Sequence, residues 1–79
     1  MHCIFVQIRC RPGTTYAVAD ALVLKELHSE LYSTSGDWDL LLKAYVPEER
    51  DIGRFVAEMV GDVADIERTL TTMTFKTLG

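Results

Sequence analysis

Two aspartates beside a glycine, in the segment Ser35-Gly36-Asp37-Trp38-Asp39, are the residues of this chain best suited to bind a small molecule. A glycine admits a positive φ and lets a ligand reach the backbone, and consecutive exposed amides form a concavity that binds anions. The aspartates beside it could hold an ammonium group. Amides that bind a carboxylate and a carboxylate that binds an amine together suit a free amino acid. The same residues are typical of a hairpin turn, so both interpretations stay open.

The rest of the sequence contains no pattern that demands catalysis or metal binding. It has no nucleophile spaced with a base, no glycine-rich phosphate loop and no pair of carboxylates on one face. His2, His28 and Glu30 could contribute metal ligands, but lone histidines at the ends of elements are more often solvated, and structural metal sites need about four ligands. We therefore expect neither a metal ion nor a cofactor.

Both cysteines, Cys3 and Cys10, fall on one expected extended segment. At about 3.3 Å per residue their Cα atoms lie more than about 20 Å apart, whereas a disulfide needs them within about 7 Å. The two thiols are therefore expected to be free, which fits a reducing compartment.

The composition is that of a globular chain, with 48% apolar residues among 79 and a net charge of −4. This length predicts one domain over residues 1–79. No apolar run approaches the roughly 20 residues that span a bilayer, and no signal peptide is recognisable. We expect a cytoplasmic protein that does not bind membranes. Its lysines and arginines are scattered rather than clustered, which disfavours direct binding to duplex DNA.

The first third of the chain predicts a strand followed by a helix. Apolar residues alternate with period two over residues 1–10, and Pro12-Gly13 would stop that strand. Apolar residues then recur at helical spacing to about His28. Thr14 or Thr15 could serve as the N-cap of this helix by accepting a backbone N–H.

The remainder predicts two strands, a second helix and a last strand. The strands cover residues 31–35 and 38–46, on either side of the glycine turn. The acidic segment 47–51 is expected to open the second helix, where carboxylates meet the positive end of the helix dipole. Gly61 is expected to end this helix in a left-handed conformation. A threonine-rich stretch over residues 66–78 predicts the fourth strand.

The element order is β-α-β-β-α-β, which predicts an α+β, ferredoxin-like fold with a four-stranded antiparallel sheet. Right-handed crossovers would place both helices on the same face of the sheet, so the chain itself leaves the other face uncovered. The first strand would present Phe5, Gln7 and Arg9 there. This mixture of residues is typical of an interface, and a chain this short buries a thin core. We therefore expect dimerisation through this face.

Five segments of the chain together carry a family resemblance. They are Arg11-Pro12-Gly13, Ala21-Leu22, Ser35-Gly36-Asp37-Trp38-Asp39-Leu40, Phe55-Val56 and Arg68-Thr69-Leu70-Thr71. With them the chain as a whole resembles the ligand-binding domain of the Lrp/AsnC, or feast-or-famine, regulators, often called the RAM domain. The central family pattern is Thr or Ser, Gly, any residue, an aromatic and Asp, and every position of it is matched here.

This resemblance implies an amino-acid effector site beside the central turn. By position, Gly36 and Asp37 would offer main-chain groups, Trp38 would wall the pocket, and Asp39 would anchor the turn or face the ligand amine. Two threonines of the last strand would supply hydroxyls. The expected ligand-binding residues are Ser35, Gly36, Asp37, Trp38, Asp39, Thr69 and Thr71. As alternatives, Trp38 could be a packing aromatic, Asp39 a turn stabiliser, and the threonines ordinary strand formers.

The resemblance also implies an assembly and a partner. Such domains dimerise through the sheet, and the dimers join into rings, here an octamer or a decamer, with amino acids held between dimers. The first expected strand already begins at His2, so we expect the family's usual helix-turn-helix domain to be missing here. We therefore expect a stand-alone sensing domain that acts with a full-length Lrp/AsnC regulator. Many members have a glycine just before the last strand, where this chain has Asp65-Ile66.

An enzyme is the alternative. Small dimers of the antibiotic-biosynthesis monooxygenase type have the same element order and oxidise aromatics without a cofactor, in a cavity between sheet and helices. Such an activity needs a polar group beside a dry pocket. The candidates for that group would be His2, His28 or Trp38. This alternative rests on fold analogy.

Overall fold

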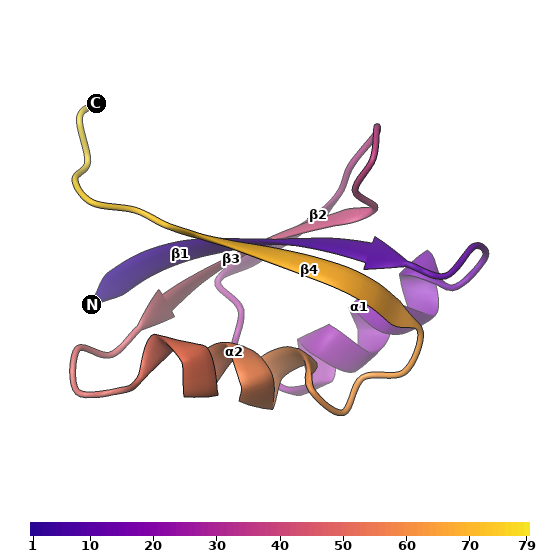
Figure 1. The fold of residues 1–79 in the computed structure, drawn as a ribbon, viewed down its shortest axis with the longest axis horizontal. Coiled ribbons are helices and arrows are strands. Elements are labelled where there is room, and N and C mark those ends of the chain that lie inside the picture. The colour runs from indigo at the N-terminus through magenta and orange to yellow at the C-terminus, as the bar shows by residue number, and fades with distance from the viewer.

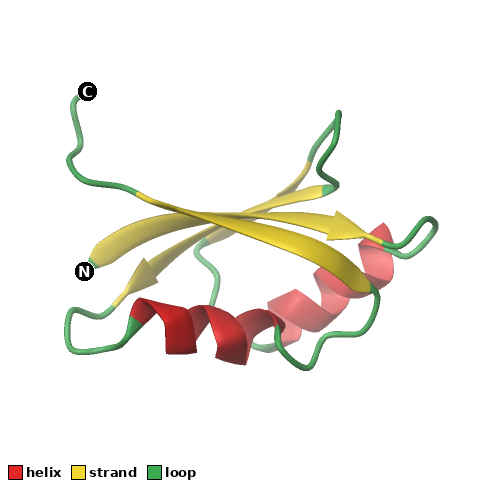
Figure 2. Cartoon of the chain, viewed as in Figure 1, coloured by secondary structure: helices red, strands yellow, loops and turns green.

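The computed structural model describes residues 1–79 as a four-stranded sheet with two helices on one side (Figure 1, Figure 2). The strands are all antiparallel and lie in the order β2-β3-β1-β4. This arrangement confirms the ferredoxin-like prediction. The elements are β1 (His2–Cys10), α1 (Thr15–Leu24), β2 (Glu30–Ser33), β3 (Leu40–Val46), α2 (Ile52–Val60) and β4 (Ile66–Met73).

The register between β1 and β3 gathers one apolar layer beneath the helices. Ile4 lies opposite Ala44, and Val6 lies opposite Leu42. Side chains that face each other across an antiparallel pair point to the same side of the sheet, so alternate residues of both strands form a continuous apolar surface. The twelve core residues, each at most 4% exposed, are Ile4, Val6, Ile8, Cys10, Val18, Leu22, Leu40, Leu42, Ala44, Val46, Phe55 and Met59.

Helix α1 differs from its prediction at both ends. Thr14 occupies the N-cap, but its hydroxyl donates to the carbonyl of Arg11 at 2.6 Å and no side chain caps the helix. The helix ends at Leu24 rather than near His28. The reason is local, because Glu26 takes a positive φ of 56°, which a right-handed helix cannot contain.

Helix α2 begins later than expected. The acidic segment 47–51 forms a turn closed by the N–H of Arg50 on the carbonyl of Pro47 at 3.0 Å, and the helix starts only at Ile52. Asp51 is the N-cap and accepts the N–H of Arg54 at 2.9 Å. The first turn of the helix therefore has no acidic residue. Gly61 was wrongly predicted to be left-handed, since its φ is −64°.

The entry to β4 depends on a left-handed aspartate. Asp65, the residue before this strand, has a φ of +70°. Aspartate is one of the few residues other than glycine that tolerate this conformation. Arg11 makes two contacts with Asp65. Its backbone N–H donates to the Asp65 carbonyl at 2.8 Å, and its guanidinium pairs with the Asp65 carboxylate at 2.9 Å. The strand ends at Met73, which is earlier than predicted.

The second face of the sheet is uncovered by any part of the chain, and we call it the open face (Figure 1). By register it presents alternate residues of all four strands. They are Cys3, Phe5, Gln7, Arg9, Glu30, Tyr32, Leu41, Lys43, Tyr45, Arg68, Leu70 and Thr72. Phe5, Gln7 and Arg9 therefore lie where the sequence placed them. Neither helix is long or apolar enough to cross a membrane.

Candidate functional site

The turn between β2 and β3 rises on the open side of the sheet, away from the helices (Figure 1). Its base is closed by the N–H of Thr34 on the Asp39 carbonyl at 2.9 Å and by the Thr34 hydroxyl on the Trp38 carbonyl at 2.8 Å. Gly36 has a φ of +87°, a conformation that strongly favours glycine. No atom lies within 4 Å of the place that a Cβ at Gly36 would take, so its backbone is open to solvent.

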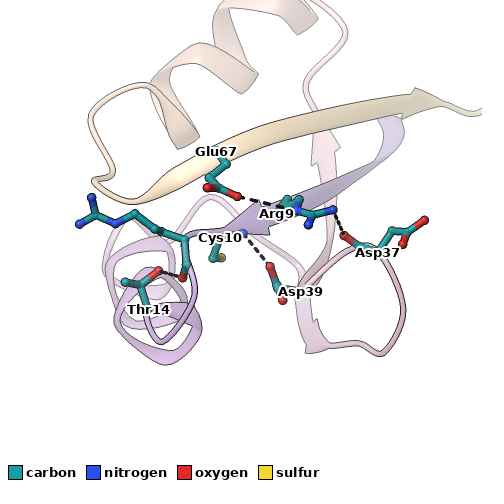
Figure 3. A network of polar contacts seen from close by, with 7 residues as sticks. Arg9, Cys10, Thr14, Asp37, Asp39 and Glu67 are labelled. Carbon is teal, nitrogen blue, oxygen red and sulfur yellow. Dashed lines mark hydrogen bonds and ion pairs between the residues drawn. The ribbon is translucent and has the colours of Figure 1, made fainter.

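Asp39 anchors this turn to β1. Its N–H donates to the Ile8 carbonyl at 2.9 Å, and its carboxylate Oδ2 accepts the N–H of Cys10 at 2.7 Å (Figure 3). The side chain thus continues the β1–β3 hydrogen bonding by one step beyond the point where the two backbones separate. A charged acceptor makes such a bond stronger than a neutral pair. Burial, followed by the negative charge of Asp39, raises the pKa of the Cys10 thiol.

Two arginines of the open face border the turn. Arg9 reaches between β4 and the turn, with its Nε 3.7 Å from Glu67 Oε1 and its Nη1 3.4 Å from the Asp37 carbonyl (Figure 3). The guanidinium of Arg68 lies over the Trp38 ring, with its Cζ 5.2 Å from the ring centre. Together with Asp37 these residues line a hollow of about 230 Å³. Pockets for drug-sized ligands run from roughly 300 to 1,000 Å³, so this hollow suits a smaller molecule.

Several polar groups around the hollow have no partner within the chain. The Arg68 side chain makes no hydrogen bond or ion pair, and the Asp37 carboxylate pairs with no cation. The backbone N–H groups of residues 35–38 donate to no protein acceptor. The residues that line the hollow thus offer unused donors and a cation beside the indole of Trp38, and the free Asp37 carboxylate projects from its rim away from Arg9 (Figure 3). Such a site can bind a small molecule that carries both charges.

Comparison with known proteins assigns the chain to a family. Residues 3–79 match the model of the Lrp/AsnC ligand binding domain. The chain belongs to this family. It is 30% identical over 73 residues to the HTH-type transcriptional regulator FL11 of Pyrococcus abyssi, covering 92% of this chain and 48% of that protein. It is 31% identical over 72 residues to FL11 of Pyrococcus furiosus, covering 91% of this chain and 47% of that protein. The chain therefore spans about half the length of these curated relatives.

Solved structures share the fold of this Lrp/AsnC domain. TTHA0845 from Thermus thermophilus superposes with a TM-score of 0.88 at 25% identity, covering all of this chain and 99% of that one. The transcriptional regulator NMB0573 from Neisseria meningitidis, solved as a complex with L-Met, gives a TM-score of 0.81 at 16% identity. That match covers 99% of this chain and 52% of that one. The relatives are named as regulators, which does not favour the monooxygenase alternative.

The ligand-binding residues expected for this Lrp/AsnC domain are not all brought together. Residues 35–39 form the turn, with Asp37 and Trp38 on the hollow and Asp39 bonded to β1. Thr69 and Thr71 lie opposite Ile8 and Val6, which point to the helices. Thr71 lines a separate groove beside the start of α2. The two threonines therefore face the other side of the sheet from the hollow.

Sequence reasoning missed the part of this Lrp/AsnC site that Arg9 and Arg68 supply. Arg9 was assigned to the dimer interface, and Arg68 entered only as part of a family motif. The signal available in the sequence was the alternation of side chains within each strand. When Arg9 lies opposite Arg68, the odd-numbered residues of β1 and the even-numbered residues of β4 share one face of the sheet. That pairing joins residues far apart in the sequence.

The histidines lie away from the hollow. His2 is opposite Val46, at the far end of β1 and β3 from the turn that carries Trp38. His28 directly precedes Ser29, whose N–H bonds to the Lys43 carbonyl. The His2 Nε2 and His28 Nδ1 atoms are buried without a hydrogen-bond partner. No group of three or more His, Cys, Asp or Glu side chains is arranged to hold a metal ion, and both cysteines are free thiols.

Proposed function

We propose that this chain is an amino-acid effector-binding and oligomerisation domain of the transcription-regulator type. The observation that carries the proposal is the hollow beside the 34–39 turn, which is lined by two arginines, an aspartate and a tryptophan in a member of the Lrp/AsnC ligand-binding family. A free amino acid carries a carboxylate, an ammonium and a side chain on one carbon, and these match the three kinds of group. The L-Met complex of the Neisseria regulator with the same fold supports this ligand class.

Assembly through the open face is the second part of the proposal. That face exposes a row of aromatic and aliphatic side chains, including Tyr32, Tyr45 and Leu70. Burying it against a second copy would remove this apolar area from water. The turn and the C-terminal segment rise from the same side at opposite ends of the sheet, and both would flank a partner seated there (Figure 1). Such homodimers would join into an octameric or decameric ring.

The regulatory output would pass through a protein partner. With a net charge of −4 and no recognition helix among its elements, the domain is proposed not to bind duplex DNA directly. It would act in the cytoplasm by modulating a full-length Lrp/AsnC regulator that reads DNA. It is proposed to be a sensor and not an enzyme, without catalytic residues, cofactor, metal or membrane contact.

A thermal-shift screen of the twenty amino acids tests the ligand class. A ligand that binds only the native state stabilises it by about 2.7 kcal/mol at a concentration of 100 Kd. We expect at least one amino acid to raise the Tm. If none does at millimolar concentration, the amino-acid proposal fails.

Replacing the turn glycine locates the site. Gly36→Val should abolish the Tm response, because a β-branched side chain disfavours φ = +87° and would stand where the ligand approaches. Gly13→Val is the matched control, since Gly13 also has a positive φ and an open Cβ position but lies in another loop. Both variants should lose stability, by about 1–2 kcal/mol each. An equal loss of ligand response in both would move the site away from the turn.

A further inference from the structure

The β1–β4 register places two arginines directly opposite each other on the open face. Arg9 and Arg68 are cross-strand partners, and like charges in such positions repel each other. Glu67 is the one carboxylate that pairs with either of them, at 3.7 Å from Arg9. One carboxylate therefore faces two guanidinium groups, so a second anion between them would relieve the repulsion.

The two arginines differ in how far they are already engaged. Arg9 is held from two sides, by Glu67 and by the Asp37 carbonyl. The Arg68 guanidinium lies over the face of Trp38, and none of its side-chain N–H donors makes a hydrogen bond or an ion pair. A guanidinium that lies over an aromatic face keeps its N–H edges free for a bidentate acceptor such as a carboxylate. Arg68 is thus the oriented and unoccupied member of the pair.

We propose that Arg68, flanked by Arg9, binds the α-carboxylate of the amino-acid effector, and that Asp37 binds its α-ammonium group. This assignment rests on the proposed function and names the groups that recognise the ligand. It gives the turn amides a secondary role and Asp39 a structural one, because the Asp39 carboxylate is already bonded to Cys10. Trp38 acts as a positioning residue for Arg68.

A carboxylate from a second copy of the chain is the competing occupant of this place. Asp37 argues against it, because this residue lines the same hollow and its carboxylate, which is turned away from Arg9, pairs with no cation (Figure 3). An incoming Asp or Glu side chain would satisfy Arg68 but add a second negative charge beside Asp37. A zwitterion brings the ammonium that Asp37 lacks. The charge pattern of the hollow therefore fits a free amino acid better than a protein side chain.

The test compares Arg68→Gln with Arg54→Gln in the full chain. Arg54 is exposed on α2, its side chain makes no ion pair, and its replacement changes the net charge by the same amount. Calorimetry with each amino acid that responds in the screen should show a loss of about tenfold to a hundredfold in affinity for Arg68→Gln. Arg54→Gln should bind like wild type. Arg68→Lys should recover only part of the affinity, because an ammonium cannot bind a carboxylate in bidentate fashion.

Ligand analogues test the same assignment on the wild-type protein. The α-carboxamide of a responding amino acid keeps the ammonium and the side chain but loses the negative charge, and it should bind at least about tenfold more weakly. Asp37→Asn should weaken binding of the amino acid by a similar factor and leave binding of its N-acetyl derivative unchanged. Equal affinity of acid and amide, or unchanged affinity in Arg68→Gln, would overturn the assignment while leaving the proposed function intact.

Two further outcomes separate the alternatives. Sedimentation equilibrium of Arg68→Gln should show wild-type association, and loss of the dimer with unchanged ligand affinity would overturn the assignment in favour of a partner's carboxylate. Benzoate, a carboxylate without an ammonium, serves as a second probe. If benzoate raises the Tm of wild type but not of Arg68→Gln while no amino acid does, the carboxylate site stands and the amino-acid function fails. If neither benzoate nor any amino acid raises the Tm, both fail.

Discussion

The two faces of the sheet are built from alternate residues of the same strands, yet their burial and composition are opposite. On β1, Ile4, Val6 and Ile8 are fully buried beneath the helices, whereas Phe5 and Gln7 between them are only partly covered and Arg9 is exposed. On β1 the helix face is apolar from Ile4 to Cys10, and β4 adds Thr69 and Thr71 to the same face. The open face mixes aromatics, aliphatics and charges. One face therefore supplies the stability of the fold, and the other is the face to which we assign association and ligand recognition in our proposal.

Leu41 and Leu42 measure this difference most directly, because they are neighbours of the same type on opposite faces. Leu42 is completely buried, and Leu41 is partly exposed on the open face. Leu42→Ala should lower the free energy of unfolding by about 2–5 kcal/mol, since it leaves a cavity in the core. Leu41→Ala should lower the free energy of unfolding by clearly less.

Urea denaturation at several protein concentrations checks this pair. A contribution from association varies with concentration, whereas a loss of core packing does not. The loss in Leu42→Ala should therefore be the same at every concentration. Equal, concentration-independent losses in both variants would show that the chain buries both faces by itself.

A charge placed on the open face should weaken assembly of the dimer. Phe5→Asp would force an unpaired carboxylate into an apolar contact between two sheets, which disfavours the dimer strongly. Sedimentation equilibrium at micromolar concentration should show association of the wild type and a shift of Phe5→Asp towards the monomer. Ala57→Asp, on the exposed side of α2, is the control with the same added charge and should associate normally. A wild-type chain that is monomeric would contradict the assigned role of this face.

The smallest effect is expected at the edge of the open face, where Glu30 accepts the Tyr32 hydroxyl and pairs with Lys43. The hydrogen bond to Tyr32, followed by that to Lys43, lowers the pKa of Glu30. The same bond raises the pKa of the Tyr32 phenol, because a phenolate would lie beside a carboxylate. The Glu30 contribution to stability is thus present above its unfolded pKa of about 4.3 and lost as the pH falls through its lower folded value. The Tyr32 contribution is present below about pH 10 and lost as the pH rises through its higher folded value.

Alkaline titration of phenolate absorbance measures this contact, with Tyr32→Phe as the difference reference that isolates Tyr32. In Glu30→Gln the Tyr32 midpoint should move to lower pH, because the carboxylate that opposes ionisation is gone. Both groups are exposed, so the change in overall stability should be slight. A Tyr32 midpoint that is the same in wild type and Glu30→Gln would show that this hydrogen bond does not persist in solution.

The sequence predicted those features of the fold that depend on local periodicity. Alternation along residues 1–10 identified β1 and the faces of Phe5, Gln7 and Arg9, and helical spacing identified α1 and α2. These patterns are readable because burial of one face imposes a period of 2 or 3.6 on the residues themselves. The ends of the helices and strands were predicted less accurately. Glu26 and Asp51 decide where the helices stop and start through a single backbone angle and a single cap, which leave little trace in the periodicity.

The candidate site was determined only by tertiary structure. The turn at Gly36 could be recognised from its residues, but its partners come from β1 and β4, which lie at opposite ends of the chain. Strand register places Arg9 opposite Arg68 and turns Thr69 and Thr71 towards the helices. A shift of one residue would have exchanged these sets, because successive side chains in a strand point to opposite faces. The sequence by itself thus determined which residues alternate, and the long-range pairing of the strands decided which of them meet.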